Sequence, residues 1–104
     1  SVVIVFNAVK LLLSAVNEVM DIAPSSEIEK LIRDTAINVE GVVELDKCKI
    51  RKTGLFYFVD LHVVVDGNIS VKEGHYISHL VKDEIMKTEP KVFDVIIHIE
   101  PDIY

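Results

Sequence analysis

The chain has no tryptophan, a single cysteine, four glycines and three prolines among its 104 residues. The lone Cys48 cannot form an internal disulfide, which favours a reducing, cytosolic context. Also missing are a glycine-rich phosphate loop and the signature motifs of serine hydrolases, zinc proteases and CxxC redox proteins. These absences exclude most nucleotide and hydrolytic chemistries, so we expect no catalytic residues and no enzyme activity.

Positive charge is also scarce, because 11 lysines and arginines stand against 17 aspartates and glutamates, for a net charge of -6. Such a balance disfavours binding to phosphate backbones, and no nucleic-acid partner is expected. What the chain does have is apolar side chains, at 50% of residues. A chain of this composition can bury a core, and we predict a folded domain.

Residues 1–22 form a long apolar segment in which polar residues recur at helical spacing, namely Asn7, Lys10, Ser14, Asn17 and Asp21. This narrow polar stripe predicts a hydrophobic N-terminal helix. The pattern fits the end of a membrane span and an ordinary core helix equally well. A secretory signal is a poor fit, because the basic start and the cleavage site are missing.

The remaining chain predicts the order α-β-β-α-β. Two capping boxes, Ser26 with Glu29 and Ser70 with Glu73, mark helix starts, and Glu89-Pro90 marks a helix end. The predicted elements are a helix over 26–38, strands over 42–52 and 55–66 around a Thr53-Gly54 turn, a helix over 70–88 and a strand over 92–99. We therefore predict an α+β open-faced sandwich, with two helices on one face of a three-stranded sheet.

Histidines are the residues through which this chain could bind a ligand. His98 and Glu100 lie two apart on the last predicted strand, so they share a face and could chelate a divalent ion. On the second strand, His62 shares its face with Asp60 and Asp66. Taken singly, each of these is as easily a solvated or core residue as a ligand.

His75 and His79 are four residues apart on the second predicted helix, a spacing at which two imidazoles can bind one metal ion. The core face of this helix is centred on Ile77, Val81 and Ile85, and both histidines, with Met86, fall on the opposite side. For His79 the pattern favours a solvated position. His75, in the first turn, could still reach the sheet edge or a neighbouring subunit.

Only 80 residues follow Pro24, which is small for a stable core without a metal, a disulfide or a partner subunit. The disulfide is excluded by the single cysteine. A metal ion or a second copy of the chain is therefore expected to complete the domain, and we predict a homodimer.

Four short segments together resemble the C-terminal cytoplasmic domain of cation diffusion facilitator transporters: Arg51-Lys52-Thr53-Gly54, Asp60-Leu61-His62-Val63, Glu73-Gly74-His75 and His98-Ile99-Glu100-Pro101. Their order and separations match most of the domain, which is more specific than any single histidine pair. The resemblance implies a metallochaperone-like fold that dimerises beneath the membrane and biases a proton-coupled metal efflux transporter.

The same resemblance implies a set of metal ligands. His62, His75, His98 and Glu100 stand where family members place ligands, with His75 as a bridging or cross-subunit ligand. Asp46 stands where some members have another histidine, and Asp60 and His79 are further possible ligands. Zinc is the first expectation, with manganese, cobalt, cadmium, iron and nickel as alternatives; the oxygen donor of Asp46 would suit harder ions such as manganese.

The resemblance also implies how the chain is organised. Residues 1–22 would be the remnant of the last transmembrane helix, and residues 23–104 the metal-binding dimerisation domain on the cytoplasmic side of the cell membrane. Its partners would be a second copy and its own transmembrane domain. The alternative interpretation is a soluble ferredoxin-like module that binds a small ligand or another protein and whose histidines are incidental.

Overall fold

The computed structural model describes residues 25–103, which form the predicted α-β-β-α-β sequence of elements. The elements are α2 (Ser25–Ala36), β1 (Glu44–Thr53), β2 (Phe56–Val65), α3 (Val71–Thr88) and β3 (Val92–Pro101). The predicted N-terminal helix over residues 1–22, and with it the proposed domain boundary, lies outside the described residues. Within residues 25–103 no helix is long and apolar enough to cross a membrane.

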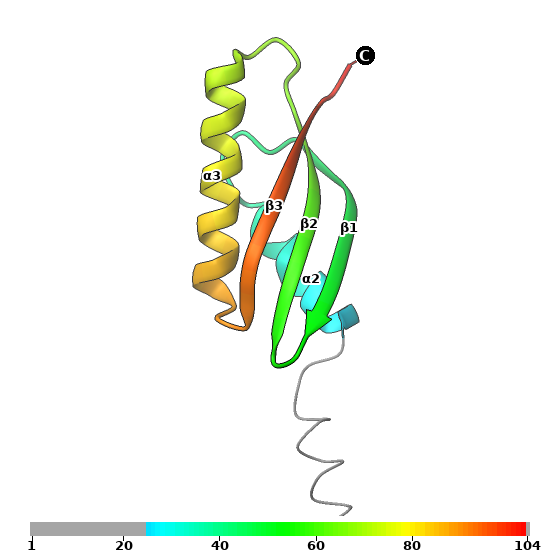
Figure 1. Cartoon of the computed structure of the whole chain (residues 1–104). Coiled ribbons are helices and arrows are strands. Elements are labelled where there is room, and N and C mark those ends of the chain that lie inside the picture. The colour runs from blue at the N-terminus through cyan, green and yellow to red at the C-terminus, as the bar shows by residue number, and fades with distance from the viewer. Residues whose placement is uncertain (1–24, 104) are drawn as a thin grey trace, which may run out of the picture.

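The sheet has the order β1-β2-β3, so β2 lies in the middle (Figure 1). β1 and β2 form an antiparallel hairpin, whose turn contains Gly54 at a φ of 64°. A residue with positive φ suits glycine, which has no Cβ to clash there. β2 and β3 run parallel and are joined through α3, the connection that parallel neighbours require.

Alternation along β2 separates the two faces of the sheet. One set of β2 side chains is buried beneath α2 and α3, so both helices cover the same face, as predicted. The other face carries no helix among the described elements (Figure 1). The core consists of Ile28, Ile32, Ala36, Tyr57, Val59, Leu61, Val63, Val65, Ile77, Val81, Ile85, Val92 and Val95.

The second capping box is present and fixes the start of α3. The Ser70 hydroxyl accepts a hydrogen bond from the Glu73 backbone N–H at 3.0 Å, and the Glu89 N–H closes the other end on the Ile85 carbonyl at 3.0 Å. The first helix begins at Ser25, so Ser26 lies inside its first turn rather than before it. These two contacts define where α3, which carries His75 and His79, begins and ends.

Two side chains differ from the sequence prediction. Leu55 was expected to begin the second strand, predicted over 55–66, but it lies in the hairpin turn and is 68% exposed. Met86 was expected on the solvent side of its helix, but it is partly buried against the core. An unbranched methionine side chain can bend around its helix to fill a gap in this way.

Candidate metal centre

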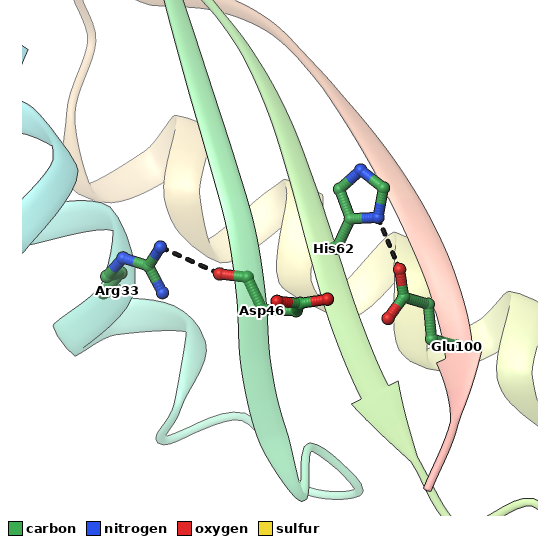
Figure 2. A network of polar contacts seen from close by, with 4 residues as sticks. All are labelled: Arg33, Asp46, His62 and Glu100. Atoms are coloured by element: carbon green, nitrogen blue, oxygen red, sulfur yellow. Dashed lines mark hydrogen bonds and ion pairs between the residues drawn. The ribbon is translucent and has the colours of Figure 1, made fainter.

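The open face of the sheet brings His62 and Glu100 into direct contact. The register places Glu100 on β3 beside Val64 on β2, two residues from His62. His62 Nδ1 lies 2.5 Å from Glu100 Oε1, and both side chains are about three-quarters buried (Figure 2). An ionised carboxylate can only accept, so the Nδ1–H donates. In the neutral form of His62 that carries its proton on Nδ1, the lone pair of Nε2 is available for a metal ion.

His98 completes the contact between β2 and β3. It lies directly opposite His62 in the parallel register, and the two imidazole rings stack at a centroid separation of 4.4 Å and an interplanar angle of 13°. His98 is exposed, whereas about three-quarters of the His62 side chain is buried. The residues alone indicated a His98–Glu100 pair along one strand, and the family resemblance grouped His62 with them. The structure brings His62, His98 and Glu100 together across two strands.

Asp46 and Asp60, the further predicted ligands on the sheet, flank this group. Asp46 lies on β1, where the pairing with β2 shifts between Leu45 and Cys48, and Figure 2 shows its carboxylate turned toward β2. Arg33 of α2 donates to the Asp46 carbonyl at 2.8 Å and so anchors this irregular part of β1 to the helix. Asp60 precedes His62 by two residues on β2, so the two share a face.

His75 and His79 lie away from this group, on α3. Both are exposed, and their Nε2 atoms approach to 3.0 Å. His75 also lines a cavity of about 440 Å³ together with the core-face residues Ile97 and Ile99. Because His98 and Glu100 alternate with those residues on β3, His75 stands on the opposite side of the sheet from them.

One protomer does not assemble a complete metal site among its described residues. Over residues 25–103, no three or more histidine, cysteine, aspartate or glutamate side chains are arranged so that they could hold a metal ion. The sheet group offers a hydrogen-bonded His62–Glu100 pair and a stacked His98. A metal site built on this group would therefore need further ligands from rearranged side chains, water or another subunit.

Sequence reasoning missed two contacts at these positions. The anchoring of β1 by Arg33 has no signal in the sequence, because it joins residues 13 apart through a bulge that only strand pairing creates. The His62–Glu100 bond also depends on which strands are neighbours and in what register. The alternation of side chains along each strand was the signal available, and it gave the correct sheet face for His62 and for Glu100.

The comparison with known families decides what kind of domain this is. A family model described as "Cation efflux protein, cytoplasmic domain" matches residues 24–102. The chain belongs to this family. The match covers all five described elements, including both strands that carry the candidate site.

Individual relatives agree with the family. Metal tolerance protein C1 of Arabidopsis thaliana is 36% identical over 85 residues, which cover 81% of this chain and 18% of that protein. The cation-efflux pump FieF of Pectobacterium atrosepticum is 27% identical over 100 residues, covering 96% of this chain and 33% of the pump. The chain thus spans a third or less of these relatives.

Solved structures confirm the fold. A variant of the MamM CTD superposes with a TM-score of 0.73 at 21% sequence identity, covering 74% of this chain and 96% of that one. A nickel form of another MamM CTD variant gives a TM-score of 0.72 at 18% identity, covering 73% and 96%. The open-faced, metallochaperone-like α+β sandwich predicted from the sequence is therefore the fold of this cation efflux domain.

Proposed function

We propose that this chain is the metal-binding, regulatory cytoplasmic domain of a divalent-cation efflux transporter. The observation that carries the proposal is the convergence of His62, His98 and Glu100 on the open sheet face of a cation efflux domain. Imidazole and carboxylate are donors that suit zinc and its neighbours. Zinc is the proposed ion, with manganese, cobalt, cadmium, iron and nickel as alternatives.

A second copy of the chain is the proposed partner at this face. Phe56, Phe93 and Ile96 are 46%, 58% and 54% exposed, and Phe93 contacts both Phe56 and Phe58. Contiguous aromatic surface on an uncovered sheet is typical of an interface. His75 would then act as a bridging or cross-subunit ligand, because it cannot reach the sheet group of its own protomer from the opposite face.

In the intact transporter, residues 1–22 would be the end of the last transmembrane helix and residues 23–104 the domain beneath it. Metal bound between two such domains would draw them together and so bias a proton-coupled export cycle on the cytoplasmic side of the membrane. The role is binding rather than catalysis. In support, the curated relatives carry the names of efflux and metal tolerance proteins.

Zinc titration of single variants tests the ligand set. We expect His98→Ala to lower zinc affinity at least about tenfold, and His62→Ala to have a similar effect. Zinc at about 100 times Kd should stabilise the wild-type fold by roughly 2.7 kcal/mol, and this gain should disappear in both variants. Retention of the full gain in both would refute the sheet site.

Two substitutions at one position separate a ligand from a positioning residue. In Glu100→Gln the amide oxygen still accepts from His62 Nδ1–H but binds metal poorly, whereas Glu100→Ala removes both functions. We propose that Glu100 leaves His62 Nδ1–H and ligates the ion directly when zinc binds, so both variants should lose zinc affinity to a similar extent. Near wild-type affinity in Glu100→Gln alone would assign Glu100 to the orientation of His62 instead.

A further inference from the structure

The two histidines of α3 form a pair that the sheet site does not use. His75 and His79 lie four residues apart on the exposed side of the helix, with their Nε2 atoms 3.0 Å apart and their rings nearly perpendicular, at 81°. The nitrogen atoms of the two rings, rather than their carbon edges, therefore face each other. A single N–H···N hydrogen bond would explain the contact without any ligand.

The same geometry also matches a chelate. Metal–imidazole bonds are about 2.0–2.1 Å long, so two nitrogens on one ion are about 2.9 Å apart at a 90° bond angle and about 3.3 Å apart at the tetrahedral angle. The observed 3.0 Å lies between these values. An ion could therefore replace the proton between the rings with little movement of either side chain.

The helix beneath the pair is rigid and well anchored. Ile77, Val81 and Ile85 bury its other side in the core, and Ser70 caps its start. Lys82, the next cation along the helix, forms an ion pair with Asp94 at 3.1 Å and is thereby held away from the pair. A chelate on such a helix loses little conformational entropy when it binds, because the backbone already fixes the spacing of the two rings.

We propose that His75 and His79 form a second metal site in each protomer, a two-histidine chelate for a divalent transition-metal ion whose remaining positions are filled by water. Copper and nickel should bind more tightly than cobalt, because nitrogen donors follow that order. The site goes beyond the proposed function, since it requires neither a dimer nor His62, His98 or Glu100. The helix site and the proposed cross-subunit sheet site would both use the Nε2 lone pair of His75, so one His75 cannot serve both at once. Only the helix site needs His79.

The experiment uses the full 104-residue chain with the sheet group removed by His62→Ala and His98→Ala. In this background we expect one Ni²⁺ per chain by isothermal titration calorimetry. Adding His79→Ala should lower the Ni²⁺ affinity at least about tenfold, because one imidazole cannot chelate. Glu84→Ala, an exposed substitution elsewhere on α3, is the matched control and should leave the affinity unchanged.

Electron paramagnetic resonance of bound Cu²⁺ gives an independent readout of ligand number. Two nitrogen couplings are expected in the sheet-deficient background and one after His79→Ala. Equal Ni²⁺ affinities with and without His79, or a single nitrogen coupling in both proteins, would overturn the proposal and leave the 3.0 Å contact as a hydrogen bond. The proposed sheet site is tested separately, by zinc titration of His98→Ala in a chain that keeps His75 and His79. The failure of one site can therefore be told apart from the failure of the other.

Discussion

His62 shows how one side chain acquires its chemistry from its neighbours. Its Nδ1–H donates to Glu100, and its ring stacks on His98, so its orientation is fixed from two directions. Metal-binding histidines are commonly held by a carboxylate in this way, which leaves the second nitrogen aimed and available. Without Glu100 the His62 ring would keep only its stacking contact with His98, and its orientation would be fixed less firmly.

Cys48 has a thiol that its surroundings make less reactive than a free cysteine. Burial raises the pKa of its thiol to about 11, and the nearby Glu29 carboxylate adds to the shift. We expect iodoacetamide to alkylate Cys48 roughly a hundredfold more slowly at pH 8 than an exposed cysteine, because the thiolate is the nucleophile. Mass spectrometry of timed reactions would measure this.

Unfolding in urea supplies the control for Cys48, since it removes both causes of the shift and should restore an ordinary rate. Equal rates in the native and unfolded chain would contradict the burial of the thiol. The result also bears on metal binding. A thiol that stays protonated is a poor ligand, and we therefore leave Cys48 out of the proposed ligand set.

At the scale of elements, the connection between α2 and β1 depends on Gly41. Its φ is 96°, and a Cβ at this position would lie 2.7 Å from Ile77 Cδ1 on α3. Gly41→Ala should therefore destabilise the fold by about 1–3 kcal/mol, through backbone strain and the displacement of a core side chain. Chemical denaturation would give the free energy of unfolding.

Gly54→Ala is the matched control for this prediction. Gly54 also has a positive φ, 64°, but nothing lies within 4 Å of a Cβ built there. Gly54→Ala should therefore lower the free energy of unfolding by roughly 1 kcal/mol, through backbone conformation alone. If Gly54→Ala destabilised the protein more than Gly41→Ala, close packing of Gly41 on α3 would not be what makes that position sensitive.

The ion pair between Lys82 and Asp94 links α3 to β3. The Lys82 ammonium hydrogen-bonds the Asp94 carboxylate and, with the Val95 backbone N–H, lowers the pKa of that carboxyl below its ordinary value. A lowered folded-state pKa means that the pair stabilises the fold above the ordinary aspartate pKa. This contribution is lost as the pH falls through the folded-state value.

Lys82→Met should therefore raise the pKa of Asp94 toward that of an unpaired aspartate and flatten the acid side of the stability profile below about pH 4. Side-chain carboxyl NMR across an acid titration would follow Asp94 directly. Lys87→Met, on the same helix but outside this ion pair, is the control. An Asp94 pKa unchanged by Lys82→Met would show that solvent screens the pair completely.

At the scale of the whole molecule, the sheet face that carries no helix among the described elements is the proposed dimer interface. We expect sedimentation analysis to find a homodimer at tens of micromolar protein with and without zinc, because a small core leaves Phe93 and Ile96 exposed. Ile96→Asp places a charge in the proposed interface and should shift the population toward monomer. Ile103→Asp, at an exposed residue outside the strands, should not.

A strictly monomeric wild-type chain, both in chelator and in excess zinc, would contradict dimerisation through this face. It would also remove the route by which His75 could join the sheet site of a second copy. The two-histidine site on α3 would be unaffected, because it lies within one protomer.

The sequence by itself determined the elements and the faces of their residues. Alternation along residues 55–66 sorted the side chains of β2 into two faces, and Ser70 with Glu73 identified the start of α3, because both signals arise from local backbone geometry. The four family segments gave the fold and the family. The alternating pattern failed where the strand begins, because Leu55 continues the pattern but lies in the hairpin turn.

Only the tertiary structure decided which side chains meet. Glu100 bonds His62 from the neighbouring strand, Arg33 holds the bulge at Asp46, and Met86 bends into the core. Each contact depends on strand order, register or side-chain reach, which involve residues distant in sequence or shapes that no local pattern encodes. The approach of His79 to His75 was possible from their spacing, but only the structure shows the rotamers that bring their Nε2 atoms to 3.0 Å.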